Sequence, residues 1–171
     1  ALARNRSASL QAESGAEMAA MTTTSAPDSA LVVAVRAALA SGGDPVRAAG
    51  QQAYMKSAMP FRGVPMPEVR RLTKGALRAH PLEDQGALID AVTELWDAAT
   101  HREELYAALT VLQLPRHRRW RDVTLLPLYE HLVLTGRWWD VVDDLATHAV
   151  GELLRAEPDR VAPAIRRWAA A

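Results

Sequence analysis

Apolar residues recur every three or four positions along most of the chain, and this spacing predicts helices. In the segment 29–41, for example, Leu31, Val35 and Leu39 fall on one side of a helix. No segment alternates apolar and polar residues for long enough to predict a strand. We therefore expect an all-α fold, with helices at about 29–41, 45–58, 82–99, 102–114, 120–135 and 158–170, and two more that start at Pro67 and near Trp138.

Turn-forming residues separate these helices. Gly42 and Gly43 end the first one, and Asp44 caps the next, which has Pro45 at its first position. Three prolines and a glycine within 59–67 predict an ordered turn. Helices of roughly 12–17 residues joined by short turns are typical of stacked helix pairs, as in HEAT and armadillo repeats. We therefore expect HEAT-like or armadillo-like helical repeats that form a curved α-solenoid, although no clean internal sequence repeat is present.

Composition narrows the class of protein. The chain has 171 residues, which is enough for one domain with a real core. The segment 1–28 is small and polar, so we expect a disordered or start-site extension there and a helical-repeat domain over 29–171. A formal net charge of +0 means that no global field draws the molecule to nucleic acid or membrane. Without a signal segment or a membrane-spanning run, we expect a cytoplasmic protein.

The predicted helix after Gly136 carries an indole and a carboxylate one turn apart. At about 100° per residue, Trp139 and Asp143 share one side of this helix. That side lies next to the apolar one, which carries Trp138 and Val141. The indole can cover a cation or a sugar ring, with an attraction of up to about 2 kcal/mol when desolvated. The carboxylate can stabilise positive charge that develops beside it.

A cationic substrate or an oxocarbenium-like transition state would suit both side chains. The alternative is a surface tryptophan beside a solvated carboxylate. Asp140 and Asp144 fall on a more exposed side of the same helix. For these two residues we expect plain solvation, or a favourable interaction with the helix N-terminus.

Basic residues cluster near several predicted helix ends. Arg70, Arg71 and Lys74 share one helix, Arg118 lies in a second cluster, and Arg137 precedes the two tryptophans. Such clusters can line a groove and bind phosphates, although a charge run is also typical of a solvated surface.

Two further side chains, Tyr54 and Lys56, flank the proline-rich turn. For Tyr54 the default expectation is a core position, and the alternative is a side chain that reaches into a bound groove. The five histidines show no metal-ligand spacing, and neither a glycine-rich phosphate loop nor a nucleophile elbow is present. The absence of cysteine excludes a thiolate zinc site and a cysteine nucleophile. We therefore expect no metal and no cofactor.

Several short motifs, taken in order, resemble those of the DNA alkylation repair (AlkD-like) glycosylases. The resemblance covers about 31–168, and its most specific piece is the Trp-Trp-Asp-x-x-Asp sequence. The motifs are Ala53-Tyr54-Met55-Lys56, Pro60-Phe61-x-Gly63-Val64-x-x-Pro67-Glu68-x-Arg70-Arg71-Leu72, Glu94-Leu95-Trp96, Arg102-Glu103 and Trp138-Trp139-Asp140-x-Val142-Asp143, followed by Gly151.

The resemblance implies HEAT-like helix pairs curved around double-stranded DNA that contains alkylated bases. It implies hydrolysis of the glycosidic bond of cationic N-alkylated purines such as 3-methyladenine and 7-methylguanine. It assigns the catalytic carboxylate to Asp143, the first aromatic wall to Trp139 and the tyrosine near the lesion to Tyr54. Together with the basic clusters, the expected DNA-binding residues are Tyr54, Lys56, Arg70, Arg71, Lys74, Arg118, Arg137 and Trp138.

Two alternatives remain open at this stage. One is a non-catalytic HEAT-like module that binds DNA or protein. The other is a relative that is specialised for bulky natural-product alkyl adducts. The resemblance also implies a second catalytic half, with an arginine and another tryptophan on later helices. The sequence to Ala171 does not contain that half, so we expect either that the chain is a fragment that lacks the C-terminal part or that those groups come from elsewhere.

Overall fold

The computed structural model describes residues 29–136 and 138–170, so the predicted extension 1–28 and Arg137 lie outside the described residues. Within the described ranges the chain forms helices and turns without a strand, which confirms the all-α prediction. The α-helices are α2 (Ala30–Ser41), α3 (Pro45–Met55), α4 (Met66–Ala79), α5 (Gln85–Asp97), α6 (Arg102–Gln113), α7 (Leu126–Gly136), α8 (Trp139–Leu145), α9 (Gly151–Ala156) and α10 (Pro158–Trp168).

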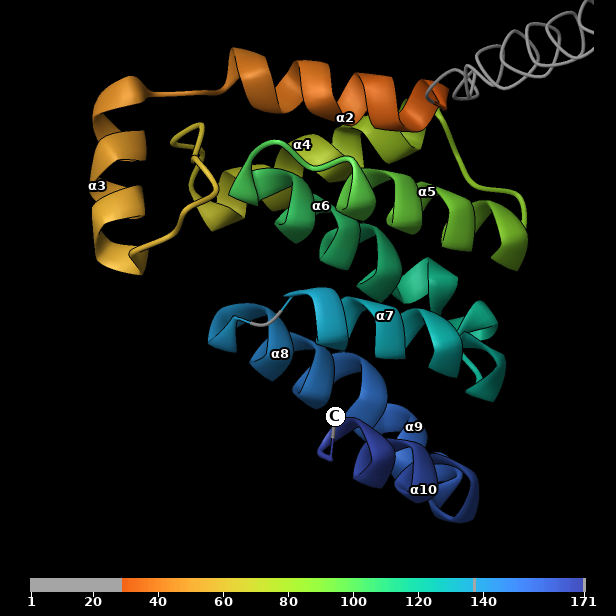
Figure 1. Cartoon of the computed structure of the whole chain (residues 1–171). Coiled ribbons are helices and arrows are strands. Elements are labelled where there is room, and N and C mark those ends of the chain that lie inside the picture. Colours follow the sequence, from red (N-terminus) through yellow and green to blue (C-terminus); the bar gives the residue numbers. More distant parts are fainter. Residues whose placement is uncertain (1–28, 137, 171) are drawn as a thin grey trace, which may run out of the picture.

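The helices form a stack, and two of its main contacts skip one helix along the chain. Helix α2 packs on α4, α4 packs on α6, and α6 packs on α5. Farther along the chain, α7 contacts α8, and α10 contacts both α7 and α9. Figure 1 shows this order as a column that runs from α2 at the top to α10 at the bottom. The arrangement agrees with the predicted helical-repeat fold.

One continuous core runs through the stack. Each of six helices contributes at least one leucine that is fully shielded from solvent, and burying such a side chain stabilises the fold by about 1.5–3 kcal/mol. The spacing of apolar residues along the sequence predicts that these leucines lie on the inner faces of their helices. The six leucines are Leu39, Leu77, Leu95, Leu112, Leu132 and Leu145.

Side-chain caps begin several helices, and the one at Asp44 was predicted from the sequence. The Ser29 hydroxyl accepts a hydrogen bond from the Val32 backbone N–H, and Asp44 caps α3 through two backbone N–H groups. Asp84 caps α5, so this helix begins at Gln85, three residues after the predicted start at Leu82. Each cap satisfies N–H groups that have no partner inside the helix, which contributes about 1 kcal/mol.

The predicted helix 120–135 is shorter than expected at its N-terminal end. Two 3₁₀ turns, η1 (Pro115–Trp120) and η2 (Val123–Leu125), precede α7. Asp122 caps the second turn through the Thr124 backbone N–H and hydroxyl. This local hydrogen bonding competes with a longer α-helix, which explains why the prediction of the helix start was wrong.

Glu103 organises the proline-rich turn from inside the protein. Its buried carboxylate accepts hydrogen bonds from the backbone N–H groups of Arg62, Gly63 and Val64, at 2.9–3.1 Å. Gly63 has φ +87°, and a Cβ atom there would lie 2.0 Å from the Asp44 carbonyl oxygen. The turn therefore needs both the glycine and the buried carboxylate.

Helices α8 and α9 form one continuous helix through a π-helical segment, Ala146–Val150. At this segment the Gly151 N–H donates to the Ala146 carbonyl, five residues earlier. A π turn holds more residues than an α turn, so side chains four apart drift less around the helix axis. Asp140, Asp144, His148 and Glu152 therefore stay on one side of the long helix.

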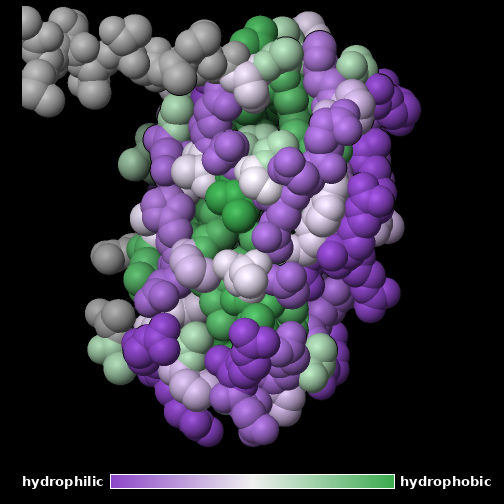
Figure 2. All heavy atoms as spheres, turned by 90° about the vertical axis from the view of Figure 1, so that its right-hand side faces the viewer, coloured by the Kyte–Doolittle hydropathy of each residue, from purple (hydrophilic) through white to green (hydrophobic). Residues whose placement is uncertain are grey.

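The surface drawn in Figure 2 is dominated by hydrophilic residues, and hydrophobic ones show between them in separate patches. Within 29–136 and 138–170, the helices are too short or too polar to cross a bilayer.

Candidate nucleic-acid interface

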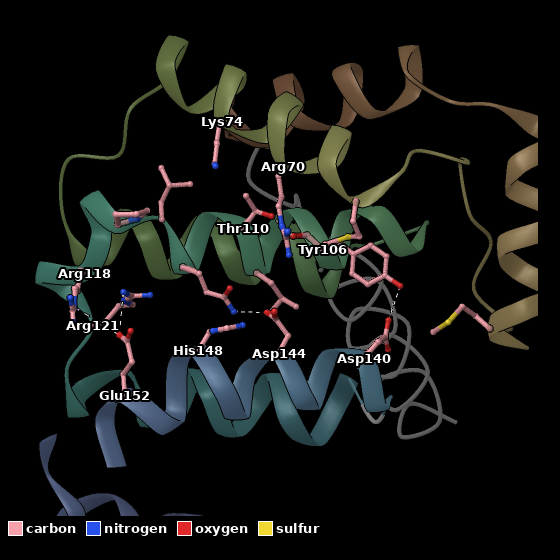
Figure 3. A pocket seen from close by; sticks show the side chains of 16 residues that line it. Arg70, Lys74, Tyr106, Thr110, Arg118, Arg121, Asp140, Asp144, His148 and Glu152 are labelled. Atoms are coloured by element: carbon pink, nitrogen blue, oxygen red, sulfur yellow. Dashed lines mark hydrogen bonds and ion pairs between the residues drawn. The ribbon is translucent and has the colours of Figure 1, made fainter. Parts of the chain in front are cut away.

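A cleft of about 670 Å³ lies between α4 and α6 on one side and the long helix α8–α9 on the other. Figure 3 shows Arg70 and Lys74 pointing into it from α4, and Asp144 and His148 from α8–α9. The cleft thus has a basic wall and a wall that carries acidic residues. Its lining residues are Met55, Met66, Arg70, Lys74, Tyr106, Leu109, Thr110, Gln113, Leu114, Pro115, Arg118, Arg121, Asp140, Asp144, His148 and Glu152.

Three of the predicted DNA-binding cations line the cleft. Arg70 and Lys74 are four residues apart on α4, so they share one side of the helix. Both are exposed, and neither forms an ion pair with a residue that the structure describes. Arg118 lies at the other end of the cleft on η1, 4.0 Å from Glu152. Arg121, which belongs to the same predicted basic cluster as Arg118, is nearly buried and lies 3.3 Å from Glu152.

Two other predicted cations, Arg71 and Lys56, do not line the cleft. Arg71 is turned away from the cleft and donates to Glu68, with 2.8 Å between its Nε and the carboxylate. This hydrogen bond is the main reason that the pKa of Glu68 is lowered. Lys56 is exposed at the C-cap of α3, in a left-handed conformation with φ 49°. Arg137 lies outside the described residues.

A buried arginine fixes the start of α8. Arg102 donates from Nη2 to both oxygens of Asp140, at 2.6 and 2.7 Å, and the Tyr106 hydroxyl donates to the same carboxylate at 2.7 Å. The guanidinium lies between two rings, 5.5 Å from the centre of Tyr106 and 5.3 Å from that of Trp138. Trp138, a predicted DNA contact, therefore packs on Arg102 at the N-cap of α8.

The pKa values of this network follow from burial and pairing. Burial alone would lower the pKa of Arg102, but its hydrogen bonds to Asp140 and Tyr106 outweigh burial and raise it. Burial, with help from the hydrogen bond to Asp140, raises the pKa of the Tyr106 hydroxyl to about 12. Arg102 and Tyr106 thus keep their protons at neutral pH, and Asp140 is held by one cation and one neutral donor.

The two residues assigned to catalysis, Trp139 and Asp143, lie outside the cleft lining. Trp139 is 60% exposed, and Asp143 is exposed, with a carboxylate that makes no hydrogen bond or ion pair within the described part of the chain. Asp143 is two residues from both Val141 and Leu145, which are buried, so it points away from the helix's own core. It lies about 60° around the helix from Asp140.

The acidic residues on either side of Asp143 are less exposed than expected. The sequence analysis assigned Asp140 and Asp144 to a more exposed side of the helix, and this was wrong. Both line the cleft and are partly buried, because Asp140 pairs with Arg102 and Asp144 accepts a hydrogen bond from Gln113. Both partners lie on α6. Contacts between helices that are far apart in sequence cannot be predicted from the spacing of apolar residues within one helix.

Tyr54 is not a core residue. It lies on α3, a helix with no buried side chain, and is 79% exposed. The default expectation of a core tyrosine was therefore wrong, and the alternative of a side chain free to reach a ligand remains. Met55, its neighbour, lines the cleft.

Two functional candidates were missed by the sequence analysis, namely Asp144 and His148. A signal was present: Asp140, Asp144, His148 and Glu152 recur every four residues, a period that places polar side chains on one side of a helix. Over the described ranges, no group of three or more acidic or histidine side chains is placed to hold a metal ion.

Comparison with known proteins agrees with this architecture. The sequence pattern of the family described as DNA alkylation repair enzyme matches residues 35–171, which is most of the chain. No curated protein matches the sequence. The family match includes every helix that lines the cleft, from α3 to α9. The chain therefore belongs to the DNA alkylation repair enzyme family.

Proposed function

We propose that this protein is a DNA glycosylase that removes cationic N-alkylated purines, such as 3-methyladenine and 7-methylguanine, from duplex DNA. The observation that carries the proposal is the charge arrangement around α8. Two unpaired cations on α4, Arg70 and Lys74, face a helix whose outer side presents Trp139 and Asp143. The cations suit backbone phosphates, and the outer side of α8 suits a positively charged nucleoside.

In this proposal Asp143 is the catalytic carboxylate. Alkylation gives the purine a positive charge, so the base departs as a neutral leaving group when the bond between C1′ and the ring nitrogen breaks. The electron pair of that bond stays with the base, and positive charge develops on the sugar. Asp143 would stabilise that charge and orient the water that attacks C1′. A single carboxylate then suffices, whereas hydrolysis between two sugars uses a pair.

Trp139 would supply the aromatic surface for the same step. A mostly exposed indole one turn before Asp143 can pack on the deoxyribose and on the charged base. The proposed function thus needs the two exposed side chains to act together, while Asp140 remains tied to Arg102.

The decisive test is release of free base from a duplex that carries one 7-methylguanine. We expect the parent protein to release the base and leave an abasic site. We expect Asp143→Asn to lower the single-turnover rate by roughly 100-fold or more, as for the loss of a transition-state charge contact. Asp159→Asn, an equal change on exposed α10, is the control and should retain the parent rate. Equal rates for the parent and Asp143→Asn would contradict the mechanism.

A second candidate function is a DNA-binding module without catalysis. It is favoured by one observation, namely that Asp143 does not line the cleft. Salt-dependent binding to duplex DNA with no base release from methylated or bulky alkyl-adduct substrates would support this candidate.

A further inference from the structure

The three carboxylates of α8 have different environments. Asp140 is neutralised by Arg102, which contacts both of its oxygens. Asp143 points outward, away from the core of its own helix. Asp144 alone of the three lines the cleft without a cation within ion-pair distance among the described residues. The cleft therefore contains one carboxylate whose negative charge is not cancelled by a direct partner.

The position of Asp144 is set by an uncharged group. The side-chain amide of Gln113, at the C-terminal end of α6, donates to Oδ2 of Asp144. An amide can orient a carboxylate but adds no opposite charge beside it. Its other oxygen has no hydrogen bond to the described residues, and Figure 3 shows the side chain directed into the cleft. The Asp144 carboxylate is thus held in place and can still accept a hydrogen bond or contact a cation.

Opposite charge faces Asp144 without touching it. Arg70 and Lys74 point into the cleft from α4, and no ion pair joins either of them to Asp144. Exposed charges stay hydrated without a direct partner at little cost, so the groups on both walls are available to a ligand. A ligand that carries both an anion and a cation satisfies both walls at once. A cationic nucleoside within a phosphodiester backbone has this chemistry.

We propose that Asp144 is a specificity-determining residue, which makes the cleft favour a nucleotide with a positively charged base or sugar over a neutral one. The inference rests on the proposed function, but assigns to Asp144 a role separate from that of Asp143. Asp143 acts on the rate of bond cleavage, whereas Asp144 acts on which nucleotide is held.

The sign of the effect distinguishes this role from general electrostatics. The Asp144 charge attracts a cationic nucleotide but repels the phosphates on either side of a neutral one. Replacing it by an amide should weaken binding of the cationic ligand and slightly strengthen binding of the neutral ligand. A change of DNA affinity alone would move both ligands in the same direction.

Two duplexes of identical sequence provide the probes. One carries a pyrrolidine analogue of the abasic sugar, which is cationic, and the other carries tetrahydrofuran, which is neutral. Binding is measured by fluorescence anisotropy at one fixed salt concentration, because DNA affinities depend steeply on salt. We expect the parent to prefer the pyrrolidine duplex. We expect Asp144→Asn to lower that preference by about tenfold, the effect of one lost charge contact.

Two variants make the result interpretable. Asp90→Asn, an equal change on α5, which does not contribute to the cleft, should keep the parent preference. Asp144→Ser removes the charge with a different shape, so agreement between both Asp144 variants excludes a misfolded protein as the cause. Thermal unfolding of each variant verifies the fold.

The inference is overturned if both Asp144 variants retain the parent preference, or if the parent itself binds the two duplexes equally. Base release from the 7-methylguanine duplex is measured in parallel. A parent that releases no base but prefers the cationic duplex in an Asp144-dependent way contradicts the proposed glycosylase activity and leaves the role of Asp144 standing.

Discussion

Charged residues have opposite environments at the start of α6 and on the walls of the cleft. At the start of α6, three consecutive charged residues, Arg102, Glu103 and Glu104, are almost completely buried. Glu104, for example, forms ion pairs with two arginines at 3.1 Å. In the cleft, Arg70 and Asp144 lie at the surface without an ion pair among the described residues.

The difference separates scaffold from site. A buried charge without a partner costs several kcal/mol, so charges inside the protein must be paired and contribute mainly by fixing a unique arrangement. Charges in an open cleft are hydrated and can stay unpaired at little cost, which leaves them available for a ligand. Pairing and burial therefore indicate which charged residues serve stability and which serve binding.

The sharpest test of the scaffold is Glu103→Ala. The substitution leaves three backbone N–H groups of the proline-rich turn without their acceptor in a buried position. We expect the free energy of unfolding to fall by about 3–5 kcal/mol, measured by urea denaturation. The exposed acid Glu83 gives a matched control, since Glu83→Ala should change stability by less than about 0.5 kcal/mol. Similar small losses for both variants would show that the buried carboxylate is dispensable.

High pH provides a second test of the paired interior. Burial raises the pKa of both Tyr106 and Tyr129 to about 12, from an ordinary value near 10. Folded protein then holds protons that the unfolded chain has lost, so this stability is complete below pH 10 and lost as pH rises towards 12. The loss is at most about 1.4 kcal/mol per pH unit for Tyr129, which is fully buried, and less for the partly exposed Tyr106.

Tyrosinate absorbance and thermal unfolding between pH 9 and 11.5 check this prediction. Tyr129→Phe should flatten the fall in stability above pH 10. The variant costs little at neutral pH, because the Tyr129 hydroxyl has no hydrogen-bond partner among the described residues. A fall in stability that is as steep in the variant as in the parent would assign the effect to other groups.

The fold was predictable because its signals are local. The spacing of Leu31, Val35 and Leu39 identified the buried side of α2, and Asp44 with Pro45 identified the start of α3. The start of α7 was not predictable in the same way, since it depends on a side-chain cap at Asp122 that competes with the helix.

The site was only partly predictable, because the sequence shows which residues are charged but not which residues they contact. Arg70 and Lys74 were identified as candidate ligand-binding cations and do line the cleft. Arg71, next to Arg70 in sequence, was assigned the same role but pairs with Glu68. Asp144 received a plain solvated role because its partner Gln113 lies 31 residues away on another helix.

Substitution of Arg70 and Lys74 tests whether cations that line the cleft contribute more to DNA binding than other cations on α4. We expect Arg70→Ala with Lys74→Ala to weaken binding to undamaged duplex DNA by roughly tenfold at moderate salt. The slope of log affinity against log salt should fall by about 2, one for each lost phosphate contact. Arg71→Ala with Arg78→Ala removes the same charge from the same helix outside the cleft. Equal effects of the two double variants would show that net charge, not the cleft, controls binding.

Substitution of Tyr54 should have the smallest effect on stability, because this side chain is not packed against the rest of the protein. Since Tyr54 is 79% exposed on a helix without buried residues, Tyr54→Ala should change the free energy of unfolding by no more than about 0.5 kcal/mol. An aromatic ring left in water next to a cleft is available to stack on a base, a contact that contributes about 1–3 kcal/mol. DNA affinity should therefore fall several-fold in a protein whose stability is unchanged. A loss of stability without a loss of affinity would assign Tyr54 to the scaffold, together with Glu103.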